Sequence, residues 1–461
     1  MSSLLTRLIY ALYTQHIKKC IIILLLLMLC QLLVACTPGH TGSNLVAFLR
    51  DGQLWTSDPD GANTFSVVSQ STPVVGYAWS PNHQLLAFRT LDTDFAKTPA
   101  ARSLTHYPQA PVIKDVPGTL NTIGVDGGTP IAIAFSSPDF SYNNPQWNSN
   151  GARLIYRQTP KNFSANPANA QWWIAQNDQP GGIAAKPFPH TFSIPSFSYN
   201  SQRYLLIGNA DKGVFTTTIA NTQKTQQVGP LAGHPLPASL ERLLWRPNHQ
   251  NQSFLYAIEA TTASRTNQPA AQLMVKLMWH TLEGPATTVA TCACTQFSWS
   301  PDGNYIIYST GTKITVLNVI HNTSFTIKTE ANAVPYWSPD SKFLLLDSSQ
   351  TLSLVNISSK QQTLLLTRSD GQTVQPSALS STNSLLQPVP NNVWSADSRH
   401  FIFVSYSHSS WQQHTLLNGQ ALYMVALNDS GKPAGAPTKV ASGAINQPGW
   451  TYEDPNTSFL F

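Results

Sequence analysis

The chain has 461 residues, 42% of them hydrophobic and only 11% charged, with a formal net charge of +5. This hydrophobic content suffices for a folded core and argues against a disordered body. Three basic residues, Arg7, Lys18 and Lys19, lie in the N-terminal leader, which leaves 24 basic and 22 acidic residues after it. The remaining charge is near +2 (24 − 22) and forms no basic run or stripe, so we expect no nucleic-acid partner.

The first 35 residues have the composition of an export signal. Lys18-Lys19 precede an apolar run, 20–30, that is too short for a comfortable membrane-spanning helix and fits a signal-peptide core. The segment Leu33-Val34-Ala35-Cys36 resembles the bacterial lipobox, in which the chain is cleaved before a cysteine that then carries lipid. We therefore predict a signal peptide (1–35), cleavage between Ala35 and Cys36, lipidation of Cys36 and a polar tether (36–44).

The alternative for the leader is an uncleaved N-terminal anchor with an incidental cysteine. Both interpretations place the body of the chain, 45–461, outside the cytoplasm, where it faces the periplasm or the cell exterior.

Three short strands are predicted first in the body, at 45–48, 53–56 and 65–68. From there onward one pattern recurs, an aromatic anchor followed by a polar turn and an apolar strand. The sequence is rich in Thr, Val, Ile and aromatic residues between turns, which favours an all-β fold. The eight anchors are Trp79, Trp147, Phe197, Trp245, Trp299, Trp337, Trp394 and Trp450.

The best-defined copy begins at Phe297-Ser-Trp-Ser-Pro-Asp-Gly303. It predicts a strand ending at Trp299, a tight turn over 301–303, and strands over 305–309, 313–319 and 324–327. The next copy follows after 38 residues, from Trp299 to Trp337. Four strands in a repeat of this length are typical of a β-propeller blade.

All other consecutive anchors are separated by 48 to 68 residues. The length beyond the 38 residues that suffice for a blade is predicted to form loops. The longest insertions are expected at 91–120, 157–170 and 369–391, and such loops on a rigid scaffold usually carry binding specificity.

The chain ends are predicted to share one blade. The first three strands lack an anchor, whereas Trp450 is an anchor with almost nothing after it. Joining them completes a sheet and removes an open edge. This gives eight blades, or seven if the weak Phe197 copy belongs to an irregular neighbour.

Two cysteines of the body are two residues apart, Cys292 and Cys294. Side chains at this spacing on a strand point the same way, so the thiols should be neighbours. We interpret them as ordinary strand cysteines or a labile disulfide rather than a redox or metal centre, because no further ligands accompany them.

The repeat Trp-Ser-Pro-Asp-Gly followed by Ile-Ile-Tyr resembles the WD40-like β-propeller repeat of the TolB type, found in bacterial periplasmic and surface proteins. The resemblance covers essentially everything after residue 44 and is best at 297–309 and 335–346. Other copies carry Asn or Ser where Asp-Gly is usual, and no separate N-terminal α/β domain precedes the repeats as in TolB. The resemblance implies a fold and a scaffolding or ligand-binding role, and no reaction.

No catalytic motif stands out in the sequence. A Gly-x-Ser-x-Gly elbow is absent, and His83, His249, His400, His408 and His414 show no metal-ligand spacing, so we expect no catalytic residue, metal or cofactor. Asp58-Pro-Asp-Gly61 and Asp302-Gly303 are interpreted as hairpin turns, because a calcium loop needs more oxygen ligands at set spacing.

Three hypotheses for the function follow. The leading one is a non-catalytic, monomeric, lipid-anchored propeller that binds a protein or peptide partner. The alternatives are a carbohydrate-binding or sensing lipoprotein and a metal-dependent propeller lyase or hydrolase. Trp172-Trp173 and Trp411 are the aromatics that could line a sugar- or peptide-binding face, although packing between sheets explains them more simply.

Overall fold

A computed structural model describes most of the body of the chain. The described residues are 44–68, 71–99, 118–160, 171–177, 186–187, 196–198, 203–207, 213–218, 224–230, 240–247, 253–260, 274–368 and 393–450, without 136, 138, 149, 150, 225, 241, 242, 283, 332, 349, 406–408, 412–414, 418, 419 and 444. All of them belong to one compact unit, Gly42–Phe461. Within them the only α-helix is the short α2 (Thr93–Ala96), and no helix is long and apolar enough to cross a membrane.

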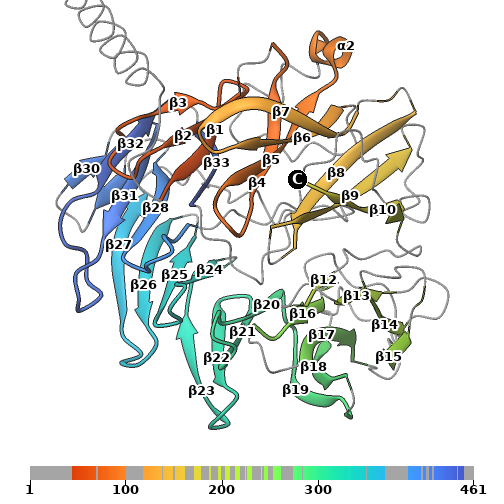
Figure 1. The fold of residues 1–461 in the computed structure, drawn as a ribbon. Coiled ribbons are helices and arrows are strands. Elements are labelled where there is room, and N and C mark those ends of the chain that lie inside the picture. The colour runs from red at the N-terminus through yellow and green to blue at the C-terminus, as the bar shows by residue number, and fades with distance from the viewer. Residues whose placement is uncertain are drawn as a thin grey trace, which may run out of the picture. The chain divides into compact units, whose positions relative to one another are not determined.

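Strands β1 to β33 of the described residues form eight antiparallel sheets (Figure 1). The first sheet contains both ends of the body, in the order β3 (Phe65–Ser66), β2 (Gln53–Ser57), β1 (Val46–Arg50) and β33 (Ile445–Trp450). The next three are β4 (Val74–Trp79), β5 (Leu85–Leu91), β6 (Gly118–Gly124) and β7 (Gly127–Ala134); β8 (Phe140–Trp147), β9 (Arg153–Pro160), β10 (Gln171–Gln176) and β11 (Lys186–Pro187); and β12 (Ser196–Phe197), β13 (Arg203–Ile207), β14 (Gly213–Thr218) and β15 (Gln226–Pro230).

The remaining four sheets complete the body. Two are four-stranded, β16 (Leu243–Trp245), β17 (Ser253–Glu259), β18 (Val275–Thr281) and β19 (Thr287–Cys292), and β20 (Gln296–Trp299), β21 (Tyr305–Thr310), β22 (Lys313–Asn318) and β23 (Thr323–Lys328). One has six strands, β24 (Val334–Trp337), β25 (Phe343–Asp347), β26 (Thr351–Asn356), β27 (Gln362–Arg368), β29 (Ser409–Trp411) and β30 (Thr415–Leu417). The last has three, β28 (His400–Ser405), β31 (Ala421–Ala426) and β32 (Thr438–Ser442).

The fold is the predicted all-β propeller. The strands β20 to β23 agree with the predicted strands to within one or two residues, and β33 pairs with β1 through Val46 and Trp450, as expected for ends that share a blade. Phe197 opens a four-stranded sheet of its own. Of the seven anchors other than Trp450, six, Phe197 included, pair with the residue seven positions later, as Trp299 does with Ile306. The exception is Trp245, which pairs with Phe254.

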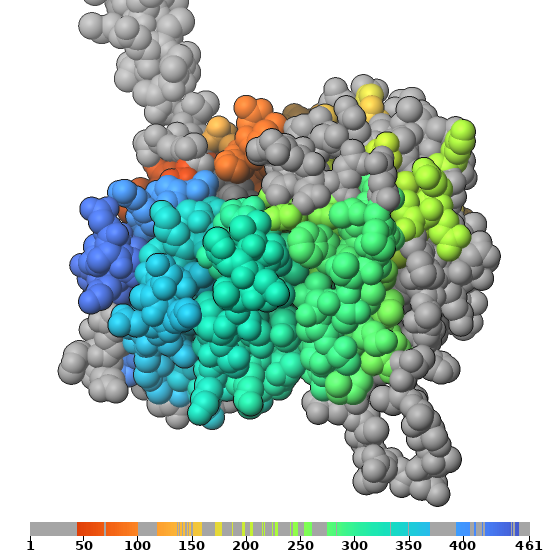
Figure 2. Space-filling model, turned by 90° about the horizontal axis from the view of Figure 1, so that it is seen from below, coloured from red at the N-terminus to blue at the C-terminus, as the bar shows by residue number. Residues whose placement is uncertain are grey.

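Hydrophobic side chains form the core between the sheets. Eight clusters of the described residues each join two consecutive sheets, among them one that packs Ile307 and Val316 against Trp337 and Leu344. One of these clusters joins the last sheet to the first, through Ile402 and Leu422 against Phe48 and Trp450. Figure 2 shows the outer surface, with the sheet β20–β23 between the sheets β16–β19 and β24–β27. These contacts are the ones a closed ring of eight blades requires; closure and blade number stay predictions, tested below.

Two sheets depart from the predicted four strands. The first strand of the Trp394 sheet is reduced to a single bridge between Trp394 and Phe401. The chain between β28 and β31 instead supplies the hairpin β29–β30, which pairs with β27 of the preceding sheet. This hairpin is held there because Trp411 is buried against Leu366 and stacks on Phe403, with ring centroids 5.8 Å apart.

The predicted insertions are also corrected at their edges. Residues 157–160 belong to β9 and 118–120 to β6, where loops were expected. Most of the insertion at 91–120, the residues 161–170, and the whole of 369–391 lie outside the described residues, except that 92–99 carry α2.

Candidate binding faces and a buried polar cluster

The anchors lie at the ends of first strands, and five of them bind the neighbouring sheet through the indole N–H group. Seven anchors are tryptophans less than 9% exposed, whereas Phe197 is half-buried. In five of them Nε1 donates to the carbonyl of the residue that precedes the previous anchor. These bonds are Trp79 to Gly449 (3.2 Å), Trp147 to Ala78 (3.2 Å), Trp245 to Ser196 (2.9 Å), Trp299 to Leu244 (3.2 Å) and Trp394 to Tyr336 (3.1 Å).

The turns after Trp79, Trp299, Trp337 and Trp394 are fixed by the same bond, in which a serine Oγ accepts from the backbone N–H five positions later. In the best copy, Ser300 Oγ accepts from the backbone N–H of Tyr305 (2.9 Å) and donates to Asp302 Oδ1 (2.5 Å). Asp302 Oδ1 also accepts from the backbone N–H of Asn304 (3.0 Å). The residue four positions after the anchor has positive φ, which Gly adopts without strain. These residues are His83 (61°), Gly151 (71°), Gly303 (70°), Ser341 (60°) and Ser398 (59°).

These turns meet one another on one face, which we call the anchor face. The backbone N–H of Asp302 donates to Ser341 Oγ (3.0 Å), and that of Asp340 donates to Ser398 Oγ (2.9 Å). A Cβ on Gly151 would lie 3.2 Å from Asn82, which has the position of Asp302 in the preceding turn. Three consecutive turns are therefore hydrogen-bonded in sequence, and a further pair lies in close contact.

The opposite face, which we call the insertion face, carries the long connections. In an antiparallel sheet successive connections alternate between the two edges, so second-to-third-strand connections and the crossings to the next sheet all lie on this face. Among the connections that contain no described strand, the four longest are 92–117, 231–242, 260–274 and 369–393, the last of which ends at the bridge of Trp394, and all four begin and end here. The segment 406–420, which contains the hairpin β29–β30, also begins and ends on this face. Its described residues include the β1–β2 turn, α2, Phe135, which is 58% exposed, and Lys313 and Lys328.

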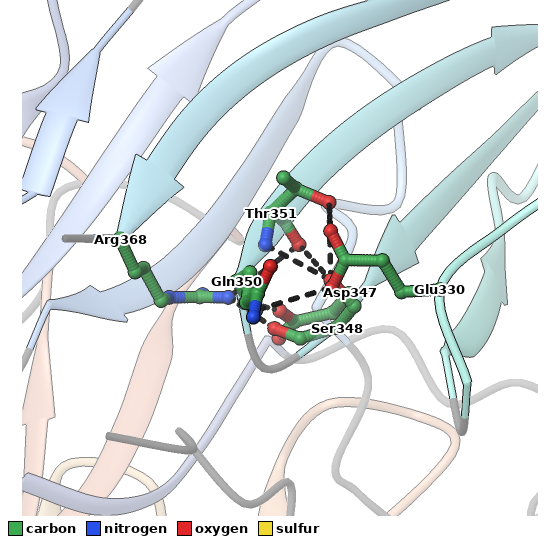
Figure 3. Close-up of polar contacts among 6 residues, drawn as sticks. All are labelled: Glu330, Asp347, Ser348, Gln350, Thr351 and Arg368. Atoms are coloured by element: carbon green, nitrogen blue, oxygen red, sulfur yellow. Dashed lines mark hydrogen bonds and ion pairs between the residues drawn. The ribbon is translucent and has the colours of Figure 1, made fainter. Parts of the chain in front are cut away.

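A polar cluster, buried at Ser348 and Arg368 and partly exposed at Glu330, Asp347 and Thr351, occupies the insertion face where the β25–β26 turn meets the crossing from β23 (Figure 3). Glu330, in that crossing, accepts hydrogen bonds from Ser348 Oγ (2.6 Å), Thr351 Oγ1 (2.9 Å) and the backbone N–H of Gln350 (3.3 Å). One carboxylate thereby joins two consecutive sheets.

Arg368, the last residue of β27, completes the cluster. Its side chain is 2% exposed, and Nη1 lies 2.9 Å from Asp347 Oδ1 and 2.5 Å from the carbonyl of Ser348. Its Nε and Nη2 have no hydrogen-bond partner within the described part of the chain. Burial raises the pKa of Asp347 against the opposing effect of the Arg368 guanidinium. Burial and the Asp347 charge also raise the pKa of Tyr336.

The cluster links two consecutive sheets, and the hydrogen bonds of its serine are not those of an activated nucleophile. Ser348 Oγ is bonded to Glu330 and to the backbone of Thr351, the pattern of a serine that fastens a tight turn. Sequence reasoning missed the cluster because its members are far apart in the chain. The sequence contains one weak indication of the cluster. A charged residue ends an apolar strand in Phe343-Leu-Leu-Leu-Asp347, although charged residues are rare in this chain.

The aromatic candidates pack within the core. Trp172 is buried against Tyr204 of the next sheet, and Trp173 packs on the other side, against the cluster of Leu154 and Tyr156. Trp411 is 2% exposed. Trp172 and Trp411 are thus buried and Trp173 is partly buried, and all three pack between or against sheets.

The remaining sequence candidates are structural where they can be seen. Cys292 and Cys294 are buried and joined by a disulfide. Asp58–Gly61 forms a hairpin turn closed by a bond from the N–H of Gly61 to the carbonyl of Asp58 (3.0 Å). Burial lowers the pKa of His83, which occupies an anchor turn, and His400 lies 3.5 Å from Asp397. In the part of the chain that is described, no group of three or more His, Cys, Asp or Glu could hold a metal.

Ala35 and Cys36, the predicted cleavage and lipidation residues, lie outside the described residues, as do His249, His408 and His414.

Comparison with known proteins identifies no family. No family model and no curated protein matches the sequence. Solved structures that resemble it include the C-terminal WD40 domain of Sif2 (11% identity, 85% of this chain, 94% of that chain, TM-score 0.47) and TolB from Acinetobacter baumannii (10% identity, 69% of this chain, 62% of that chain, TM-score 0.34). Another is oligogalacturonate lyase from Vibrio parahaemolyticus (9% identity, 84% of this chain, 98% of that chain, TM-score 0.47).

Proposed function

We propose that this chain is an exported, lipid-anchored β-propeller that binds a protein or peptide partner on its insertion face and catalyses no reaction. The single observation that supports the binding face is the position of the connections: the four longest ones that contain no described strand start and end on one side. On the other side the turns after Trp299, Trp337 and Trp394 are bonded in sequence to each other. A surface of variable length on a repetitive scaffold is where propellers can vary their specificity without changing the core.

The proposed membrane attachment follows from the leader. Lys18-Lys19, the apolar run 20–30 and Leu33-Val34-Ala35-Cys36 occur in the order of a lipoprotein signal. A lipid on Cys36 would hold the propeller on the outer side of the membrane across which it is exported, in the periplasm or at the cell exterior.

Purification of the tagged full-length protein from native membranes tests the proposal. We expect a stoichiometric protein partner to be retained, and a Cys36→Ser variant to lose membrane association. Retention of glycan with no protein would support a carbohydrate-binding role instead. Stoichiometric metal in the purified protein would count against a non-catalytic scaffold.

Matched charge reversals locate the binding face. Lys313→Glu/Lys328→Glu alters two exposed residues of the insertion face, and Lys342→Glu/Lys432→Glu alters two exposed residues of the anchor face. We expect the first pair to reduce the retained partner at least tenfold and the second pair to leave it unchanged. Loss confined to the anchor-face pair would contradict the proposed face.

A further inference from the structure

The position at which the body begins determines which face lies near a lipid on Cys36. Val46, the first residue of β1, pairs with Trp450, and Arg50 at the other end of β1 pairs with Ile445. Trp450 is an anchor at the end of its strand, so the start of β1 lies on the anchor face. The preceding chain therefore leaves the propeller on the side opposite the insertion face.

The tether between Cys36 and Val46 is short. Nine residues, 37–45, separate them, so the two Cα atoms are joined by ten steps. Ten steps span at most about 35 Å when fully extended.

The reverse orientation needs nearly the whole tether. To reach the insertion face around the rim, the chain would first pass the outer strands β2 and β3, about 10 Å at the usual strand spacing. It would then run along the height of the sheet, about 20 Å for six residues of strand. The sum is about 30 Å, close to the maximum length of the tether, whereas the anchor face, where β1 begins, requires none of this path.

We propose that the anchor face lies toward the bilayer and that the insertion face is presented to a protein partner that approaches from the aqueous side. This inference rests on the proposed lipidation of Cys36. The anchor face adds little attraction of its own, because its exposed charges are mixed: Asp340 lies 3.3 Å from Lys342, and Arg399 lies 3.4 Å from Asp429. The tether then sets the orientation.

Energy transfer to a bilayer tests the orientation with a matched pair of labels. Lys342→Cys on the anchor face and Lys313→Cys on the insertion face change the same residue type at exposed positions of adjacent sheets. Cys292 and Cys294 are buried in a disulfide and do not compete for the dye. Each full-length lipidated protein carries one donor dye and is bound to phosphatidylcholine vesicles that contain an acceptor on the lipid headgroup.

We expect higher transfer from position 342 than from 313, because the two faces are about 20 Å apart. Equal or higher transfer from 313 would overturn the inference. A 20-residue Gly-Ser insertion after Gly42 should remove the difference; a difference that persists would show that the tether does not orient the protein, and would also overturn it.

The outcome for the proposed lipid anchor is read separately by flotation of the vesicles. Cys36→Ser versions should fail to float with the vesicles and show no transfer from either label. If the protein that retains Cys36 also fails to float, the proposed lipidation of Cys36 is wrong, and the inference about orientation is wrong with it. If it floats and the transfer order is reversed, lipidation stands and only the orientation is wrong.

Discussion

The anchor tryptophans act at the scale of single residues through one polar atom on a large apolar ring. Burial of the indole ring provides most of the packing. Its N–H fixes the orientation of the ring, because it donates to a carbonyl of the neighbouring sheet. Trp337 and Trp450 are exceptions, since their Nε1 atoms have no partner in the described part of the chain. A matched comparison of two anchors can therefore separate the hydrogen bond from the packing.

Trp147→Phe should lower the free energy of unfolding by about 1 kcal/mol more than Trp337→Phe. Both substitutions replace a buried indole by a smaller ring, but only the first removes a donor that is hydrogen-bonded, to the Ala78 carbonyl at 3.2 Å. Urea unfolding of the two variants measures the difference. Equal losses would show that the indole bond contributes nothing measurable.

Asp397 provides a pH dependence at the same scale. Burial acts to raise its pKa, but hydrogen bonds from Ser395 Oγ and the N–H of Arg399, together with His400, outweigh it and lower the pKa below 3.8. The folded state therefore holds the proton less tightly than the unfolded state. The stabilisation is present above about pH 4 and is lost as the pH falls through the lowered value.

Asp397→Asn should accordingly reduce stability by about 1 kcal/mol at pH 7, a modest effect because the side chain is partly exposed. The difference from the unaltered protein should narrow below pH 4. Thermal melts from pH 3 to pH 7 follow it, and a difference that stays constant across this range would contradict the role given to the carboxylate.

At the scale of elements, the cluster around Arg368 fixes the ends of three strands and a crossing between sheets. Buried ion pairs add little net stability over apolar residues of the same size, yet removal of one partner leaves an uncompensated charge. The hairpin β29–β30 lies beside this cluster, because β29 pairs with β27 from Leu366 to Arg368. Damage to the cluster should thus affect the whole six-stranded sheet.

Arg368→Ala should destabilise the protein by about 3–5 kcal/mol, because Asp347 stays buried without its partner. Arg399→Ala is the matched control, since its ion pair with Asp429 is exposed and should be worth less than about 0.5 kcal/mol. The double variant Arg368→Met/Asp347→Leu should recover most of the loss. Chemical denaturation of the three variants measures this, and similar stabilities for Arg368→Ala and Arg399→Ala would show that the pair is dispensable.

At the scale of the whole molecule, the body depends on the pairing of its two ends. β33 contributes Ile445 and Trp450, both fully buried, to the cluster that joins the last sheet to the first. The same strand accepts the indole bond of Trp79, at Gly449. One strand therefore secures contacts on both of its sides.

Deletion of 445–461 should lower the melting temperature steeply or prevent folding, because it exposes the edge of β1 and the first anchor loses its acceptor. Deletion of 451–461 alone leaves β33 intact and is the control. Differential scanning calorimetry compares the two. A stable, cooperative protein without β33 would argue against a closed ring.

The repeat, the anchors and most strands followed from the sequence alone, because they depend on local rules. Strand side chains alternate with a period of two, and the Ser-Pro-Asp-Gly turn satisfies its own backbone within six residues, as Ser300 and Asp302 show. The pairing of the two ends of the body was also predictable. Trp450 is an anchor with no strands after it, and the first three strands have no anchor before them, so together they complete one blade.

The tertiary structure decided what depends on residues distant in the chain. One network contains Glu330, Asp347 and Arg368, because segments from two sheets come together there. The spacing of these residues in the sequence does not predict that contact. The hairpin around Trp411 pairs with the preceding sheet because its ring finds apolar surface on both Leu366 and Phe403. The face that gathers the long connections was likewise fixed only by the alternation of antiparallel strands across aligned sheets. Local chemistry set the parts of this protein, and non-local packing set which of them became neighbours.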